Sequence, residues 1–193
     1  MRATLFLAVV VVSSAAAMAQ GDGLREAVAL GQTHDDALFE SFNKGYSLAA
    51  TDTIEHAEIV TEFRRAVLMV REKALGGDYG FRDARLAQAL EPSKGLVTFM
   101  VRVRLHPLNT LVKLPPYDLY VSTGPRSPPI PAKGLKRDPI YALGPMGSPL
   151  AGVRLEASFP RADIERAAAP ALIVTDDKAE IIWQARVDLS RYR

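Results

Sequence analysis

The stretch LVTFMVRVRL, Leu96 to Leu105, alternates apolar and polar side chains with a period of two residues. This period is typical of a β-strand that buries one face and exposes the other. The apolar face is formed by Val97, Phe99, Val101, Val103 and Leu105. Arg102 and Arg104 lie on the opposite face. The stretch therefore predicts a strand from which two arginines project side by side, away from a core.

Segments that follow Leu105 repeat this strand pattern. We expect further strands over residues 111–114, 117–122, 140–143, 151–159, 171–175 and 180–189, with a helical turn at 161–168. The first strand and these six make about seven, which is the number and spacing that an antiparallel immunoglobulin-like β-sandwich needs. The resemblance concerns the architecture alone, because a chain without cysteine lacks the Cys…Trp…Cys signature of true immunoglobulin domains.

The residues that precede Leu96 have a helical period instead. Capping residues and glycine stops predict a short helix that ends near Gly45, a long helix from Asp52 to Gly76 and a third helix over 81–90. On the long helix, His56 falls within the apolar stripe. The carboxylates of Glu55, Glu58 and Glu62 gather on another face. We therefore expect a packed histidine and no metal site.

These patterns predict an α+β fold. An N-terminal helical segment, residues 20–95, would pack on a C-terminal antiparallel immunoglobulin-like β-sandwich of about seven strands, residues 96–193. The first segment has a formal charge of −4 and the second a charge of +5. Halves of opposite charge either dock on each other or leave the basic half for an anionic partner. Docking is the simpler interpretation.

Residues 1–19 have the features of a signal peptide. An arginine precedes an apolar run from Leu5 to Val12, and Ala17-Met18-Ala19 fits the A-x-A cleavage rule. The run is shorter than a membrane-spanning helix, so we expect no transmembrane segment after cleavage. An uncleaved N-terminal anchor is the alternative. The prediction is a bacterial protein that is periplasmic or secreted.

A basic, proline-rich stretch is the candidate ligand-binding region. Seven of the thirteen prolines lie between Pro125 and Pro149. The same region holds Arg126, Lys133, Lys136 and Arg137. Together with Arg102 and Arg104, these residues would form a cationic patch for an anionic envelope component or an acidic protein surface. The alternative is an inert, solvated crossover. Nucleic acid is not expected, because an exported protein does not meet it and the patch lacks interleaved aromatic residues.

The sequence shows no convergent set of catalytic groups. It has no cysteine nucleophile and no G-x-S-x-G elbow, and we assign no catalytic residue, cofactor or metal. The resulting prediction is an exported, non-catalytic binding protein. One alternative is a secreted hydrolase at the helix-to-sandwich junction, with His106 or His56 as base and Glu55, Glu58 or Glu62 as acid. Another is a structural subunit that assembles through strand edges.

Overall fold

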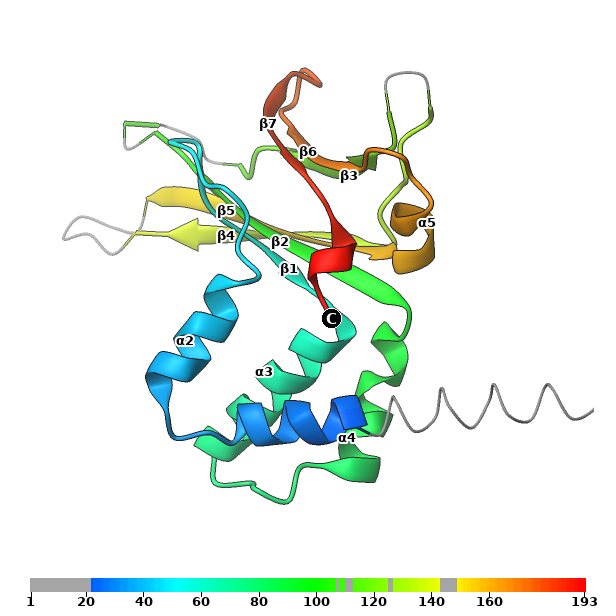
Figure 1. The fold of residues 1–193 in the computed structure, drawn as a ribbon. Coiled ribbons are helices and arrows are strands. Elements are labelled where there is room, and N and C mark those ends of the chain that lie inside the picture. Colours follow the sequence, from blue (N-terminus) through cyan, green and yellow to red (C-terminus); the bar gives the residue numbers. More distant parts are fainter. Residues whose placement is uncertain (1–21, 107, 110–112, 125–126, 143–148) are drawn as a thin grey trace, which may run out of the picture. The chain divides into compact units, whose positions relative to one another are not determined.

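A computed structural model describes residues 22–106, 108–109, 113–124, 127–142 and 149–193. It contains helices and two antiparallel sheets (Figure 1), so the α+β class is confirmed. The chain divides into two compact units. The helical unit is described over residues 22–41 and 63–92, and the two-sheet unit covers residues 42–62 and 93–193.

The structure leaves two of the expectations from the sequence untested. The predicted signal peptide, residues 1–19, lies outside the described residues and stays a prediction. Among the residues that are described, no helix has both the length and the apolar character needed to cross a membrane. The docking of the helical segment on the sandwich also stays a prediction.

The helical unit is built around one long helix. Its elements are a helix over residues 22–31, α2 (Asp36–Lys44), α3 (Glu62–Leu75) and α4 (Asp83–Leu90), followed by a 3-10 turn, η1 (Glu91–Ser93). The unit boundaries fall within α2, after the first residue of α3 and within η1. Helix 22–31 lies close to α3, because a Cβ atom at Gly31 would be 2.7 Å from the Val70 Cβ. α3 ends before Gly77, whose positive φ of 82° suits glycine at a helix C-terminus.

Seven strands lie within the described residues of the two-sheet unit. They are β1 (Ile54–Val60), β2 (Leu96–Arg104), β3 (Asp118–Ser122), β4 (Leu135–Tyr141), β5 (Leu150–Pro160), β6 (Ala171–Thr175) and β7 (Ile181–Arg186), with α5 (Arg161–Glu165) and η2 (Leu189–Arg191). The four-stranded sheet has the order β1-β2-β5-β4, and the three-stranded sheet has the order β3-β6-β7. Figure 1 shows the two sheets as separate layers of this unit.

The core of the unit is formed by the facing sides of the two sheets. Phe99 of β2 and Phe159 of β5 meet edge to face, with ring centroids 5.7 Å apart, and both are fully buried. Leu172 and Trp183 contribute from the three-stranded sheet. The buried Trp183 satisfies its Nε1–H by donating to the Ala49 carbonyl oxygen at 3.1 Å. The sandwich-like arrangement is therefore stabilised by apolar burial, and the one polar ring atom of Trp183 is hydrogen-bonded.

The predicted helix from Asp52 to Gly76 is wrong in its first half. Residues Ile54–Val60 form strand β1, and the helix begins at Glu62. The cause is a β-bulge between Ile54 and His56. It places both Ile54 and Ala57 on the buried face, although they are three residues apart. A spacing of three between buried residues mimics the helical period and conceals the alternation of a strand.

The count of seven strands in the described part of the chain agrees with the prediction, but their membership differs. β2, β3, β5, β6 and β7 lie close to their predicted positions. The short strand predicted at 140–143 is instead β4, Leu135–Tyr141, and β1 was predicted as helix. Of the strand predicted at 111–114, residues 111 and 112 lie outside the described part, and residues 113 and 114 are not in a strand.

Two local features of the helical unit also differ from expectation. Helix 22–31 was not predicted, because glycines occupy its second and last positions and its apolar stripe is short. At the start of α2, Asp35 acts as the N-terminal cap by accepting from the Leu38 backbone N–H at 3.0 Å. Asp36, which by its spacing from Thr33 would complete a capping box, instead pairs its carboxylate with Arg71.

Candidate functional site

The face of the four-stranded sheet that points away from the core carries mostly charged side chains. The register of the antiparallel strands aligns them into rows that cross the sheet. One row contains His56 of β1, Arg102 of β2, Arg154 of β5 and Asp138 of β4. Directly opposed residues of an antiparallel pair project from the same face, roughly 5 Å apart at Cβ. We call this surface the outer sheet face.

Arg102 and Arg154 form a like-charge pair at the centre of this row. Their direct opposition across β2 and β5 is unfavourable unless anionic groups lie nearby. Asp138 accepts a hydrogen bond from the Arg154 Nη2 at 2.8 Å, and this contact raises the pKa of the arginine. Arg154 therefore keeps its positive charge and is paired with Asp138. The positive charge of Arg102 has to be balanced by other groups.

The carboxylate of Glu55 is shared between two arginines without a hydrogen bond to either. Its oxygens lie 3.6 Å from the Arg102 Nη1 and 3.7 Å from the Arg104 Nη2. Within the described residues, neither guanidinium donates a hydrogen bond. The Arg102 side chain is 48% exposed and that of Arg104 is 56% exposed. These donors are accessible to a ligand, and two arginines with one glutamate leave a net positive charge.

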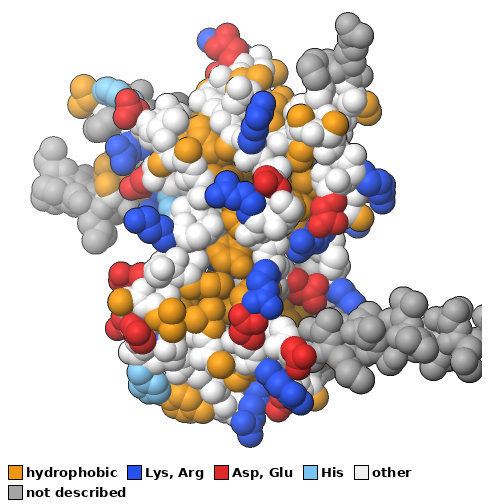
Figure 2. Space-filling model, in the orientation of Figure 1, with side chains coloured by type: hydrophobic (Ala, Val, Ile, Leu, Met, Phe, Trp, Pro, Cys, Tyr) orange, Lys and Arg blue, Asp and Glu red, His pale blue; other side chains and the backbone are white. Residues whose placement is uncertain are grey.

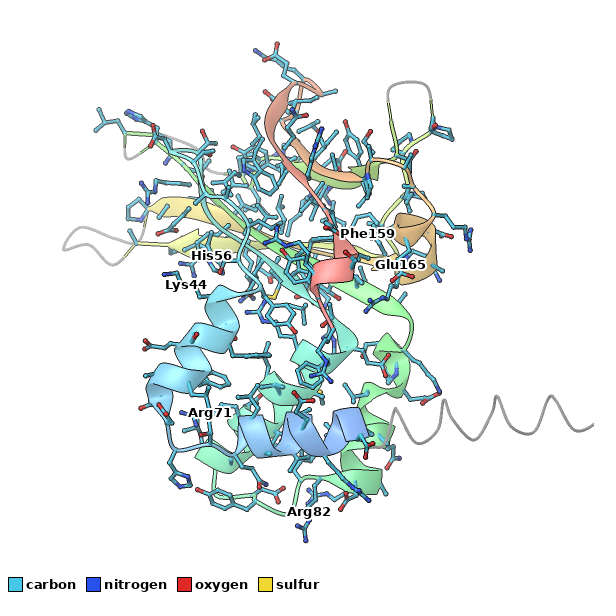
Figure 3. All side chains as sticks on the ribbon, viewed as in Figure 1. Lys44, His56, Arg71, Arg82, Phe159 and Glu165 are labelled. Carbon is cyan, nitrogen blue, oxygen red and sulfur yellow. The ribbon has the colours of Figure 1, made fainter. Side chains whose placement is uncertain are left out.

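The structure corrects the prediction for His56. Its side chain is 49% exposed on the outer sheet face, and its Nε2 lies 3.3 Å from an oxygen of Glu58. On a helix the two side chains would have diverged, but on a strand residues two apart share a face. Figure 3 labels His56 at this strand. The predicted packed histidine is therefore an exposed histidine beside a largely buried carboxylate.

A second row on the same face mixes charges of both signs. It contains Glu58, Met100, Glu156 and Lys136, in the order of the strands. Lys136 is exposed, and within the described residues its side chain makes no hydrogen bond or ion pair. In the view of Figure 2, Lys and Arg side chains are interspersed with Asp and Glu side chains. The outer sheet face is thus a mixed surface in which the arginines at Glu55 form the most cationic part.

The predicted binding residues of the proline-rich stretch do not share one surface. Lys136 lies in β4 and projects from the outer sheet face. The next residue, Arg137, points the other way, and its Nε donates to the Tyr117 carbonyl oxygen at 2.6 Å. Its Nη2 also pairs with Asp118. Arg137 therefore ties β4 to the start of β3.

The other two predicted residues of that stretch give less information. Lys133 is exposed, and its backbone N–H donates to the Ser158 carbonyl oxygen at 2.7 Å. Arg126 lies outside the described residues. A ligand-binding role for Arg126, Lys133 and Arg137 stays a prediction.

The residues of the hydrolase alternative are brought together only in part. His56 and Glu58 form the close pair described above. His106 follows β2, and its Nδ1 accepts from the Leu108 backbone N–H at 3.1 Å. In the described part of the chain, no group of three or more His, Asp or Glu side chains is arranged to hold a metal ion.

A separate groove lies at the end of the three-stranded sheet. Its volume is about 660 Å³, and it is lined by the α5–β6 connection and by residues 186–190. The polar groups at one wall satisfy each other, since the Ser190 hydroxyl donates to the Asp188 carboxylate at 2.6 Å. This hydrogen bond and that from the Ser190 backbone lower the pKa of Asp188, which keeps it a carboxylate. The groove therefore has the volume for a ligand, but the Asp188 and Ser190 side chains at its wall already hydrogen-bond to each other.

Arg154 and Asp138 were missed by sequence analysis. The alternating pattern over 151–159 does place Arg154 on the polar side of its strand. The register between β2 and β5, which sets Arg154 against Arg102, has no local signal in the sequence.

Comparison with models of known protein families, with curated proteins and with solved structures found no match to this chain.

Proposed function

We propose that this chain is an exported, non-catalytic binding protein that holds an anionic envelope component on the outer sheet face. The observation that carries the proposal is the pair of guanidinium groups at Glu55. Arg102 and Arg104 are about half exposed, lie beside like-charged Arg154, and have no hydrogen-bond acceptor within the described residues. The export part of the proposal rests on the sequence of residues 1–19.

An anionic group would relieve the repulsion in this arrangement. Guanidinium groups bind carboxylate, sulfate or phosphate oxygens through paired N–H donors. A bound anion would supply the acceptors that Glu55 is too distant to provide, and it would screen Arg102 from Arg154. Lys136 on the neighbouring row is a further contact for an extended, repeating anionic ligand.

The strand order supports an immunoglobulin-like topology for the two-sheet unit. When β1 to β7 are lettered A to G, the four-stranded sheet has the order A-B-E-D and the other sheet contains C, F and G. Constant-type immunoglobulin domains divide their strands in the same way. In this proposal α3 and α4 are an insertion between the first two strands. An experimental structure in which β1 did not pair with β2 would contradict it.

The binding proposal is tested with two anionic probes of different kinds. One is a vesicle of phosphatidylcholine and phosphatidylglycerol, and the other is polygalacturonate, a carboxylated polysaccharide. We expect the protein to bind at least one of them at low ionic strength and to release it as salt screens the charges. The double variant Arg102→Gln/Arg104→Gln should lose about tenfold or more in affinity, because hydrogen bonds between charged groups are removed.

A variant with the same loss of charge provides the control. Lys178→Gln/Arg186→Gln removes two exposed positive charges from the β6–β7 hairpin of the same unit. It should keep its affinity within about twofold. Equal losses of affinity in the two double variants would show that binding depends on net charge alone and not on Arg102 and Arg104. Failure of the wild-type protein to bind either probe would contradict the proposal.

The His56–Glu58 pair favours a second candidate, the secreted hydrolase. A carboxylate 3.3 Å from an imidazole can orient it as a general base. The Ser47 backbone pairs with Glu58 in an isolated bridge, so a serine lies on the segment beside β1 at this position. A screen of esterase, glycosidase and peptidase substrates tests this candidate. Turnover that His56→Ala abolishes would favour the hydrolase over the binding protein, and His106→Ala tests the other predicted base.

A further inference from the structure

His56 lies in the row of the outer sheet face that also holds Arg102. The two residues are directly opposed across β1 and β2, so their side chains project from the same face with Cβ atoms roughly 5 Å apart. About half of each side chain is exposed. An anionic oxygen that reaches the Arg102 guanidinium therefore also comes within reach of the imidazole.

The two ring nitrogens of His56 have different surroundings. Nε2 lies 3.3 Å from an oxygen of Glu58. Because a carboxylate only accepts hydrogen bonds, it holds a proton on Nε2, and Nδ1 of the neutral ring is then an acceptor that repels an anion. Protonation converts Nδ1 into a second N–H donor. Within the described residues Nδ1 makes no hydrogen bond, so this donor is available to a ligand.

The charges that surround the imidazole cancel each other. Glu55 and Glu58 of β1 supply two negative charges, and Arg102 and Arg104 of β2 supply two positive charges. With a neutral imidazole this part of the outer sheet face has no net formal charge. Protonation of the ring therefore gives it a net positive charge and makes it more attractive to an anion.

The charged groups described on the neighbouring elements come in pairs of opposite sign. Arg154, the next residue in the row, is paired with Asp138. Along the other edge of β1, residues 46–51 contain no charged side chain. The charged residues that flank this segment are Lys44 and Asp52, which are both exposed. The imidazole is therefore the group whose titration changes the local charge between mildly acidic and neutral pH.

We propose that His56 is a third cationic contact for the anion bound by Arg102 and Arg104, and that it makes this contact only when it is protonated. The inference rests on the proposed function, because it concerns the same site and the same ligands. A histidine gains its charge as the pH falls from about 8 to about 5.5. The protein therefore binds an anionic envelope component more tightly in mildly acidic surroundings.

Binding to the full chain at two pH values tests the proposal, with the phosphatidylglycerol-containing vesicle and polygalacturonate as probes. Their phosphodiester and uronate groups stay ionised from about pH 5.5 to about pH 8, so the probes keep their charge. We expect affinity to rise about fivefold at the lower pH, the effect of one unit charge a few ångströms from an anion in water. Equal affinity at both pH values would overturn the proposal and leave the proposed function standing. Binding at neither pH would contradict both.

Variants assign the pH dependence to His56. His56→Gln has no charge and should bind with the weaker affinity at both pH values. His56→Lys is charged at both, and at about pH 8 it should bind as tightly as the wild type does at about pH 5.5. His34→Gln removes an exposed histidine of the helical unit and should keep the full increase. An increase that persists in His56→Gln, or disappears in His34→Gln, would refute the assignment.

Nuclear magnetic resonance of the histidine rings gives a readout that does not depend on measured affinity. Binding and protonation are linked, so an anion that contacts His56⁺ must favour the protonated ring. Saturating polygalacturonate at about pH 6.5 should therefore raise the protonated fraction of His56 and leave that of His34 unchanged. Circular dichroism checks that each variant remains folded. An unchanged protonated fraction of His56 in the saturated complex would overturn the proposal.

Discussion

The inner and outer faces of the four-stranded sheet are built from the same strands but have opposite characters. On β2, Phe99 and Val101 are buried in the core, whereas Arg102 and Arg104 are about half exposed. Successive side chains of a strand point to opposite faces, so neighbouring residues can serve unrelated purposes. Along β2, the residues that stabilise the fold therefore alternate with the residues that we propose bind the ligand. Substitutions at adjacent residues should therefore separate the two properties.

The largest separation is expected between Phe99 and Arg102. Phe99→Ala should reduce the free energy of unfolding by about 3–5 kcal/mol, because it removes a buried ring and leaves a cavity beside Phe159. Arg102→Ala should change stability by less than about 0.5 kcal/mol. Urea unfolding followed by the fluorescence of Trp183, the single tryptophan, measures both in the two-sheet unit. Similar losses in the two variants would break the comparison between the faces.

Gly152 is an intermediate case, because it lies on the outer sheet face but is buried. It pairs with Arg104 and Ile140, and a Cβ atom there would lie 2.6 Å from the Val103 carbonyl oxygen. Gly152→Ala should therefore cost about 1–3 kcal/mol by forcing β2 and β5 apart. The same fluorescence experiment tests it. A stability equal to that of the wild type would show that the strands do not approach so closely.

Lys136 and Arg137 allow the same comparison of the two faces on the edge strand β4. Arg137→Ala should destabilise the two-sheet unit by about 1–2 kcal/mol, since it removes the hydrogen bonds to Tyr117 and Asp118. Lys136→Ala, on the outer face, should change stability by less than about 0.5 kcal/mol. Thermal unfolding of both variants measures the difference. A larger effect at Lys136 than at Arg137 would reverse the roles that the structure assigns them.

The smallest expected effect is the pH dependence at Tyr117, which packs at the margin of the core. Burial raises the pKa of the Tyr117 hydroxyl above its ordinary 10.0, and the charges of Asp176 and Asp177 act in the same direction. The unfolded chain therefore releases this proton at lower pH than the folded protein does. The stabilisation present below pH 10 is then lost as the pH rises through the raised pKa.

Alkaline unfolding of Tyr117→Phe tests this dependence. The variant should lose stability less steeply than the wild type above pH 10, because phenylalanine has no proton to release. Tyr141→Phe, which changes an exposed tyrosine, controls for the general effect of removing a phenol. Equal slopes for wild type and Tyr117→Phe would show that the raised pKa has no influence on stability.

Prediction from sequence succeeded where the pattern was local and regular. The sequences of β2 and β5 alternate over 97–105 and 151–159, and Gly77 marks the end of α3. β1 pairs with β2 just as β5 does, yet it was predicted as helix. The bulge at Glu55 removes the regular alternation, and no nearby residue indicates that β2, some forty positions later in the chain, will be its partner. Local preference was outweighed by a distant strand pairing.

The sequence by itself determined the α+β class, the absence of disulfides and the division of β2 into an apolar and a cationic face, because period and composition are local properties. The tertiary structure alone decided that Arg154 stands opposite Arg102, that His56 meets Glu58 and that Arg137 ties two strands together. These contacts depend on strand register and on which residues the two sheets bury against each other. Both are set by hydrogen bonding and burial between segments far apart in the chain.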